Sequence, residues 1–486
     1  MDAIAFCSAG ELSAMLRDGK ISSVELLRHY LDRVARLNPA LNAIIYMDAE
    51  AAMARAAAAD EARAAGQSWG PLHGLPITIK DSFEITGMPT TSGAPELREY
   101  HAKENAVAAQ RLMDAGAIIF GKTNLPLYAG DLQSYNSVYG TTNNPWDVSR
   151  TPGGSSGGAA AAVAAGLCGM ELGSDIGGSI RTPSGFCGIY GHKSSWGLVP
   201  GRGHIPGPPG SLTMDDIGVT GPMARAPEDL ALALNIIAGP DPLMGPPRLD
   251  SLPAANDKPL KGLRIAAWID DPVCPADSAV GDQLQSLLDA LARAGACVND
   301  KARPDIDARR AFGVYAQLLM GVMAAGFPES ALNRFRKIAQ SFDPEDMSYA
   351  ARSALGAIQT HRQWLSANEA RQRIRAKWME LFRDFDVLLC PITPTAAFPH
   401  DHSPNQTARH IEVNGKPFPY MEQIFWAGII GMAYLPSTAA PIGRTPAGLP
   451  VGVQIVGPYY GDLTTIRVAG LLREITGGFV PPPEYA

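Results

Sequence analysis

The sequence predicts one large α/β domain. The apolar runs Leu75–Ile79 and Ala117–Phe120 are typical of short buried strands, and a helical pattern at Glu104–Asp114 separates them. A strand, a helix and a second strand in that order favour a parallel crossover, the building unit of α/β folds. Strand character returns late in the chain, at Val387–Leu389 and Val451–Val456, which indicates that C-terminal strands rejoin the first sheet.

The N-terminal region predicts helices that lead into this sheet. Ser22 and Glu25 form a capping-box pattern for a helix over Val24–Leu37. We expect this helix to end at Asn38–Pro39, because the residue before a proline disfavours helical geometry. The alanine-rich stretch Ala51–Ala65 predicts a second helix.

The middle of the chain predicts a helical excursion. Gly239–Pro259 is rich in proline and glycine and is the best linker candidate. Beyond it, Leu263–Ile269 is a strand candidate, Val280–Ala294 is helical, and residues 309–385 are mostly helical. The expected parts of the single domain, residues 1–486, are a core at about 70–225, an excursion at about 240–385 and a C-terminal return to the sheet at about 386–475.

Composition describes a globular protein with a large core. Hydrophobic residues make up 46% of the 486 residues and charged residues 18%, which excludes a disordered chain. The formal net charge of −7 leaves no general basic field, so nucleic acid is not expected as a partner. The 6 cysteines are scattered without a C-x-x-C pair, which argues against a zinc knuckle or a disulfide scaffold and fits a reducing cytoplasm.

One uncharged stretch, Gln423–Gly443, raises the question of a membrane segment. Its dense apolar part, Ile424–Leu435, is 12 residues long and is followed by Pro436. A membrane-spanning helix needs roughly 20 predominantly apolar residues. We therefore expect buried core here and no membrane partner. With no targeting segment visible, the expected location is the cytoplasm.

Three short segments carry residue types that suit catalysis at a carbonyl group. The first, Gly74–Asp81, places Lys80 at the end of an apolar strand. A desolvated lysine has a lowered pKa, and its neutral amine can act as a base near pH 7. Taken alone, a lysine in such a position is more often an ordinary surface residue, so the other two segments decide the interpretation.

The second segment, Gly153–Gly158, is a serine-containing glycine loop that precedes the helix-forming run Ala159–Ala165. It satisfies the G-x-S-x-G pattern of α/β-hydrolases, but that pattern requires a strand directly before it, and residues 143–152 form a turn-rich loop. A phosphate-binding loop would end in G-K-S or G-K-T, which is absent. We predict a turn before a helix, with amides that point at a ligand.

The third segment, Gly173–Arg181, predicts an anion-binding turn. Its two adjacent glycines allow successive backbone amides to crowd around one anionic point, as an oxyanion hole requires. The expected donors are the amides of Ile176, Gly177, Gly178 and Ser179. A tight glycine turn that closes a sheet is the alternative. Asp175 and Arg181 flank the glycines, and we expect them to pair and hold the loop rigid.

Together these segments resemble the amidase signature family. Lys80, Ser155 and Ser179 are separated by 75 and 24 residues, in the order that this family shows. Further stretches that resemble the family are Gly121–Asn124, Gly140–Trp146, Pro183–Gly191, Gly218–Met223 and Gly448–Gly457. The resemblance covers roughly residues 10–475 and implies a single α/β/α sandwich around a twisted, mixed β-sheet.

The resemblance also implies a mechanism. Ser179 is the expected nucleophile, Ser155 the serine in a cis peptide bond that bridges, and Lys80 the base. Ser155 would accept the proton of Ser179 and pass its own to neutral Lys80, and water would hydrolyse the acyl-enzyme. The expected activity is hydrolysis of C–N bonds in linear amides other than peptide bonds, without a metal or cofactor.

The acyl and amine parts of the substrate are left open. Apolar residues in Tyr420–Leu435 and the small Ala129 and Gly130 favour a small apolar or aryl amide. Ala129, Gly130 and Ser155 are the expected substrate contacts. A carbamate or ester hydrolase of the same family is an alternative, because the same serine can attack those substrates. The expected assembly is a monomer or a homodimer.

Rival interpretations come from other classes. One is an amidotransferase A-type subunit that helps to make aminoacyl-tRNA and needs partner chains. Ile176 stands where that subunit commonly has threonine, which favours a free-standing amidase. A non-catalytic binding module is disfavoured, since all three catalytic residue types are present. The stretch His192–Ser195 departs from the family pattern. A histidine cluster in a polar loop, such as His400–His402, is more often solvated than metal-binding, so no metal site is predicted.

Overall fold

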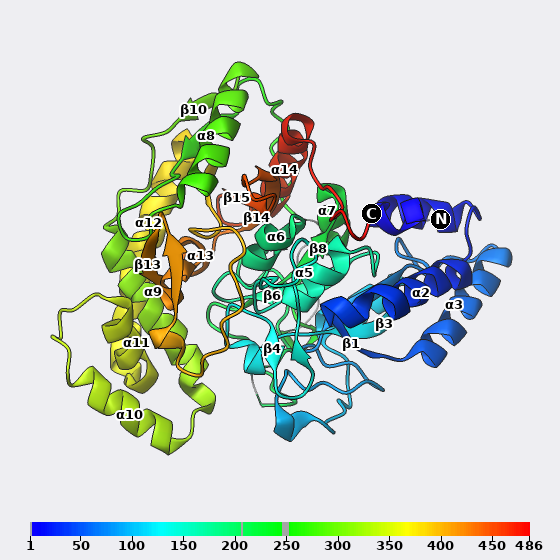
Figure 1. Ribbon diagram of the computed structural model, residues 1–486, viewed down its shortest axis with the longest axis horizontal. Coiled ribbons are helices and arrows are strands. Elements are labelled where there is room, and N and C mark those ends of the chain that lie inside the picture. The colour runs from blue at the N-terminus through cyan, green and yellow to red at the C-terminus, as the bar shows by residue number, and fades with distance from the viewer. Residues whose placement is uncertain (1, 206–207, 245–251) are drawn as a thin grey trace.

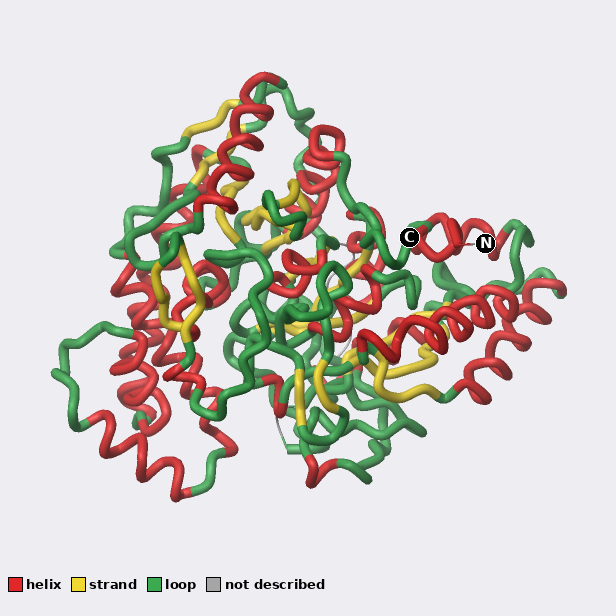
Figure 2. Tube along the Cα trace, viewed as in Figure 1, coloured by secondary structure: helices red, strands yellow, loops and turns green. Residues whose placement is uncertain are grey.

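The fold is built on one mixed, 11-stranded β-sheet (Figure 1, Figure 2). The computed structural model describes residues 2–205, 208–244 and 252–486. Across the sheet the strands follow the order β1 (Ile44–Met47), β3 (Ile118–Thr123), β2 (Pro76–Lys80), β6 (Glu171–Asp175), β8 (Val219–Ala224), β7 (Tyr190–Lys193), β14 (Ser437–Arg444), β15 (Pro450–Val456), β11 (Val387–Pro391), β9 (Arg264–Ala267) and β10 (Cys297–Asn299).

The sheet combines parallel and antiparallel pairs. β2 is parallel to both β3 and β6, and β9 is parallel to both β10 and β11. Antiparallel pairing joins β8, β7, β14 and β15 in the middle of the sheet. The predicted parallel crossover from β2 to β3 and the predicted return of C-terminal strands to the first sheet are therefore confirmed.

Helices surround the sheet (Figure 1). They are α1 (Ala9–Arg17), α2 (Ser23–Leu41), α3 (Ala49–Ala64), α4 (Val107–Asp114), α5 (Gly157–Ala164), α6 (Arg181–Cys187), α7 (Pro227–Ile237), α8 (Ser278–Arg293), α9 (Ala308–Met323), α10 (Glu329–Ala339), α11 (Tyr349–Ile358), α12 (His361–Asp384), α13 (Phe425–Gly431) and α14 (Asp462–Thr476). Two small hairpins pair β4 (Tyr135–Asn136) with β5 (Gly140–Thr141) and β12 (His410–Val413) with β13 (Lys416–Pro419).

Side-chain alternation along the strands divides the core into two layers. On β9, Ile265 and Ala267 belong to one buried apolar cluster and Ala266 to a second. On β11, Leu389 joins the first cluster and Leu388 the second. Successive side chains of a strand point to opposite faces of the sheet. The sheet thus lies between two packed layers, which confirms the expected α/β/α sandwich.

The helical excursion consists of α9 to α12 and lies at the left of Figure 1. The predicted excursion at about 240–385 is not purely helical, because it contains β9 and β10, which join the large sheet. α9 packs against α11, α12 and α13. Residues 245–251, in the centre of the linker candidate, lie outside the described residues. The division into core, excursion and return remains a prediction.

One helix boundary differs from the prediction. The capping box of Ser22 and Glu25 is present, but the helix continues through Pro39 to Leu41. The Asn38 side chain accepts hydrogen bonds from the amides of the two residues after the helix cap, which stabilises this last turn.

The apolar stretch Ile424–Leu435 is buried throughout, as predicted. It forms α13 and the turn that follows. Across the described ranges, no helix combines the length and the apolar character that crossing a membrane would require.

Candidate active site

Lys80 is fully buried at the carboxyl end of β2, where its amine contacts two hydroxyl groups. Nζ lies 2.6 Å from Ser155 Oγ and 3.0 Å from Ser174 Oγ. Burial lowers the pKa of Lys80 to about 7, although the negative charges of Asp175 and Glu171 act to raise it. A substantial fraction of this amine is therefore neutral near pH 7, as a general base must be.

The register of the sheet brings Lys80 next to the third sequence segment. Ile79 of β2 pairs with Leu172 of β6 in a parallel ladder. β2 ends at Lys80 and β6 ends at Asp175. Because parallel strands end at the same edge of a sheet, the lysine meets the turn that follows β6.

The Gly154–Ser155 peptide bond is cis, as the family resemblance implies. Gly154 is packed so closely that a Cβ on it would lie 2.6 Å from the backbone nitrogen of Gln133. Ser134 Oγ donates to the Gly153 carbonyl at 3.0 Å and accepts from the Gly157 amide at 3.0 Å. The serine loop is thus tied both to the segment before β4 and to the start of α5.

Ser179 lies in the turn between β6 and α6, with 5% of its surface exposed. Its carbonyl accepts a hydrogen bond from the Ser156 amide at 3.1 Å, which joins the two glycine-rich loops directly. Within the described residues, no hydrogen bond links the hydroxyl of Ser179 to that of Ser155, whose oxygen lies 2.6 Å from Lys80 Nζ instead. The nucleophile proposed from the sequence is therefore held close to the serine loop through its backbone.

Three of the four expected oxyanion-hole donors have no acceptor in the described parts of the chain. Among these residues, none accepts a hydrogen bond from the amide of Ile176, Gly177 or Ser179. The Gly178 amide instead donates to Asp175 Oδ1 at 2.9 Å. The structure removes Gly178 from the candidate donors, because the carboxylate that stabilises the turn already occupies its N–H.

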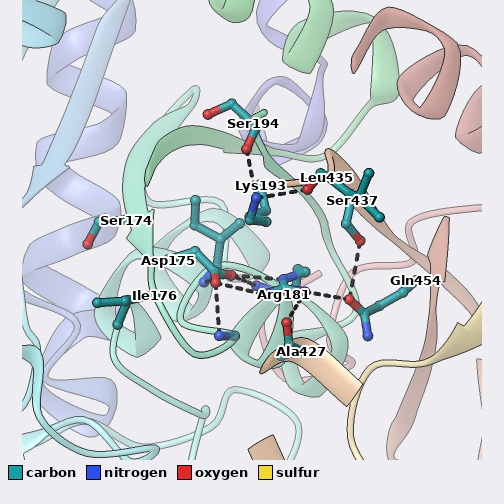
Figure 3. Close-up of polar contacts among 12 residues, drawn as sticks. Ser174, Asp175, Ile176, Arg181, Lys193, Ser194, Ala427, Leu435, Ser437 and Gln454 are labelled. Atoms are coloured by element: carbon teal, nitrogen blue, oxygen red, sulfur yellow. Dashed lines mark hydrogen bonds and ion pairs between the residues drawn. The ribbon is translucent and has the colours of Figure 1, made fainter. Parts of the chain in front are cut away.

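A buried ion pair holds this turn (Figure 3). Arg181 Nη2 lies 2.8 Å from Asp175 Oδ1, and its Nε lies 3.0 Å from Oδ2, so the predicted pairing is confirmed. Nη1 of the same guanidinium donates to the Ala427 carbonyl and to Gln454 Oε1. Burial acts to raise the pKa of Asp175, but the charge and hydrogen bonds of Arg181 outweigh it and lower the pKa to about 2.

A second buried lysine lies beside this pair, on β7 (Figure 3). Lys193 Nζ donates to the carbonyls of Ser194 and Leu435 at 2.9 and 2.8 Å. Burial, and after it the positive charge of Arg181, lower the pKa of Lys193 to about 7. The stretch His192–Ser195, which departs from the family pattern, is thus fully buried at the end of β7 and just beyond it.

The expected substrate contacts Ala129 and Gly130 lie in the loop after β3. The backbone of Ala129 is left-handed, with φ of 55°, and Gln406 Nε2 donates to the Gly130 carbonyl at 3.1 Å. Residues 131–133, which follow directly, pack on the cis peptide bond. This places the pair beside the Ser155 loop, and its contact with a substrate stays a prediction.

The histidine cluster noted in the sequence lies near the same loop. The rings of His400 and His402 have centroids 5.3 Å apart, and burial lowers the pKa of both. In the parts of the chain that the structure describes, no group of three or more His, Cys, Asp or Glu side chains is arranged to hold a metal ion.

Two residues of the site are not predicted from the sequence. Ser174 precedes Asp175 on β6, and its hydroxyl is the second partner of Lys80. Gln454 is the single polar side chain in the strand Val451–Val456. A lone amide in an apolar strand signals a buried hydrogen-bond partner, which proves to be Arg181.

Comparisons with known proteins show what this chain is similar to. The family model described as Amidase matches residues 25–466. The A-type subunit of the glutamyl-tRNA(Gln) amidotransferase from Acidothermus cellulolyticus is 34% identical over 503 residues, covering 97% of this chain and 95% of the relative. A solved structure of a vestigial protein complex, which bears on the origins of an s-triazine catabolic enzyme, is 29% identical with a TM-score of 0.80, covering 98% of this chain and 100% of that one. A crystal structure of an amidase is 28% identical with a TM-score of 0.78, covering 97% and 100%.

Proposed function

The chain belongs to the amidase family, and on this premise we propose that it hydrolyses the C–N bond of a carboxylic amide through an acyl-enzyme on Ser179. The observation that carries the proposal is the buried contact of 2.6 Å between Lys80 Nζ and Ser155 Oγ, next to a cis peptide bond. This contact supplies a base and a proton carrier beside the turn that holds the nucleophile.

The first half of the reaction forms the acyl-enzyme. The Ser179 proton moves to Ser155 Oγ while the Ser155 proton moves to neutral Lys80, and the Ser179 oxygen attacks the amide carbon. The substrate carbonyl oxygen becomes an oxyanion, which the amides of Ile176, Gly177 and Ser179 stabilise. The proton then returns by the same path to the leaving nitrogen, the C–N bond breaks, and the acyl group stays on Ser179 as an ester.

The second half releases the acid. A water molecule gives its proton to the Ser155–Lys80 relay and attacks the ester carbon. The same amides stabilise the second oxyanion. Return of the proton to Ser179 breaks the ester bond, so the carboxylic acid leaves and the resting side chains are restored.

We propose a small apolar or aryl acyl group as the substrate part that enters this site. The support is the apolar helix α13, which packs on the turn: a Cβ on Gly178 would lie 3.0 Å from Ala427 Cβ. The small side chains of Ala129 and Gly130 near the serine loop add to this support. Esters and carbamates with the same acyl group remain alternatives, because they react with the same nucleophile.

The relatives named as amidotransferase subunits favour a second candidate function. In it, the same acyl-enzyme chemistry releases ammonia from an amide, and partner chains transfer the ammonia to glutamyl-tRNA(Gln). Ile176, which stands where such a subunit commonly has threonine, argues for the first candidate.

The purified single chain distinguishes the two candidates. An aryl amide, a fatty amide, a carbamate, a peptide amide and glutamine would be assayed without ATP or tRNA. We expect the chain alone to release amine from at least one of the first four, and Ser179→Ala to abolish it. Turnover confined to glutamine and dependent on partner subunits would favour the amidotransferase. A chain without turnover, and without fluorophosphonate labelling of Ser179, would refute both.

A further inference from the structure

We infer that Tyr315, on the helical excursion, is a positioning residue for the oxyanion hole. The inference rests on the proposed function, because it concerns the amides that would stabilise the oxyanion. Tyr315 belongs to α9 and lies 139 residues after Ile176, the residue of the turn that it contacts.

The contact is a single, partly buried hydrogen bond. Tyr315 is fully buried, and its hydroxyl donates to the Ile176 carbonyl at 3.1 Å. Burial raises the pKa of this phenol well above its usual value, so the hydroxyl keeps its proton and remains a donor. The excursion therefore contacts the turn where the candidate donors begin.

This hydrogen bond fixes the direction of one candidate donor. The C=O of Ile176 and the N–H of Gly177 belong to one planar trans peptide group, in which the two bonds point in opposite directions. With the carbonyl held by Tyr315, the Gly177 N–H points away from the tyrosine hydroxyl. It meets no acceptor in the described parts of the chain, which leaves it available to an oxyanion.

The other peptide groups of the turn are fixed by the same principle. The Gly178 carbonyl accepts from the Thr182 amide at 2.7 Å, and this carbonyl shares a peptide plane with the unoccupied N–H of Ser179. The peptide group between them, made of the Gly177 C=O and the Gly178 N–H, points the opposite way, because its N–H donates to Asp175. Thr182 and Asp175 lie in or beside the turn, whereas Tyr315 comes from a distant helix.

Two glycines make room for the tyrosine. A Cβ on Gly177 would lie 2.8 Å from the Tyr315 hydroxyl oxygen, and a Cβ on Gly428 of α13 would overlap the ring itself. Neither position accepts a larger residue while the ring stays in place. The ring is therefore clamped between the turn and α13, which gives the hydroxyl a defined direction.

Tyr315→Phe tests the inference, since it keeps the ring and removes only the donor. Removing one oxyanion-hole donor outright costs roughly 10²–10³-fold in kcat. Loosening one should cost less, and we expect kcat to fall about 10-fold with KM within about twofold. The matched control is Tyr349→Phe on α11, whose ring stacks on Phe312 in the same cluster at 5.5 Å, and it should leave kcat unchanged.

Two inhibitors that differ only at the reacting carbon separate positioning from packing. A phenethyl trifluoromethyl ketone would form a hemiketal with Ser179 and place an oxyanion in the turn, whereas the corresponding alcohol cannot. In Tyr315→Phe, the Ki of the ketone should rise by the factor by which kcat/KM falls, and the Ki of the alcohol should stay constant. Equal shifts for both inhibitors, or none for the ketone, would overturn the inference.

A second variant reaches the same contact from the opposite side. Gly428→Ala adds a methyl group that displaces the Tyr315 ring while the hydroxyl remains. It should therefore also raise the Ki of the ketone and leave the Ki of the alcohol unchanged. Fluorophosphonate labelling separates the two possible failures. A wild-type chain that is not labelled on Ser179 refutes the proposed function. A labelled wild type whose Tyr315→Phe variant keeps its kcat and ketone affinity refutes only the role of Tyr315.

Discussion

Lys80 Nζ lies 2.6 Å from Ser155 Oγ and 3.0 Å from Ser174 Oγ, so one buried amine bridges two hydroxyl groups. A neutral amine has one lone pair and two N–H bonds. It can therefore accept the Ser155 proton while it donates to Ser174. The pair of hydroxyls thus orients the lone pair of the base toward the proton that it must take.

The pH–rate profile should show the titration of Lys80. Burial lowers its pKa to about 7, so the neutral base is lost below this pH and is fully present well above it. We expect kcat/KM to rise through about pH 7 and then level off, and Lys80→Met to be inactive across the range. A profile that still rises near 10.4, about the ordinary lysine value, would contradict a neutral base.

The same lysine should make stability depend on pH. The unfolded chain keeps the Lys80 proton up to about pH 10.4, whereas the folded chain releases it above about 7. The unfolded state therefore binds more protons between these values, and the wild-type free energy of unfolding gains from this group as pH rises.

Chemical denaturation of Lys80→Met and wild type at pH 7 and 9 measures this effect. The stability advantage of the variant over the wild type should shrink by about 2.3 kcal/mol between these two pH values, because the folded Lys80 is already half neutral at pH 7. Lys193, whose pKa is also lowered to about 7, is present in both proteins and cancels in the comparison. A difference that does not change with pH would show that Lys80 is charged in the folded chain.

Ser155→Ala should damage amide cleavage more than cleavage of the matched ester. An amide needs its leaving nitrogen protonated, and the ester has a better leaving group that needs less proton donation. Water can replace a relay hydroxyl in part, so we expect slow ester turnover to survive while amide turnover falls at least 10-fold further. Steady-state kinetics on one acyl group in both forms provides the test, and equal losses would remove Ser155 from the leaving-group step.

Arg181→Met should destabilise the fold strongly, because it leaves the Asp175 carboxylate buried without its partner. Breaking a buried ion pair on one side costs about 3–5 kcal/mol. The control is Arg473→Met, which breaks an ion pair with Glu228 whose two side chains are 41% and 62% exposed. Exposed pairs contribute about 0–1 kcal/mol. Denaturant titration compares the two, and similar losses would show that the turn does not depend on Arg181.

The sequence predicts the candidate catalytic segments because each is a local pattern. A lysine after an apolar strand, a glycine loop before an alanine-rich helix, and Asp175 six residues before Arg181 can all be recognised without knowledge of the fold. The direction of a single peptide group cannot be recognised in this way, so the sequence does not distinguish the Gly178 amide, which donates to Asp175, from its neighbours.

Contacts between elements that are distant along the chain cannot be predicted from the sequence either. Tyr315 meets Ile176 across 139 residues, and its place on α9 follows from helix packing that no motif records. The short strands β1 and β10 were missed for another reason. β1 is an apolar run of only 4 residues and β10 has only 3, and both are partly exposed edge strands, so neither is long enough to be recognised as a strand from the sequence.

The sheet order has a consequence for synthesis on the ribosome. β14 and β15 occupy the space between β7 and β11, and Gln454 of β15 accepts a hydrogen bond from Arg181 across 273 residues. A chain emerges from its N-terminus, so Lys80, Ser155 and Ser179 leave the ribosome long before the strands that complete their scaffold. In a nascent chain, the three candidate catalytic residues are therefore present before the sheet that holds them is complete. Apolar strand edges stay exposed until β15, which ends at Val456, is available. The proposed hydrolysis therefore requires nearly the whole polypeptide to be synthesised, because β15 ends at Val456.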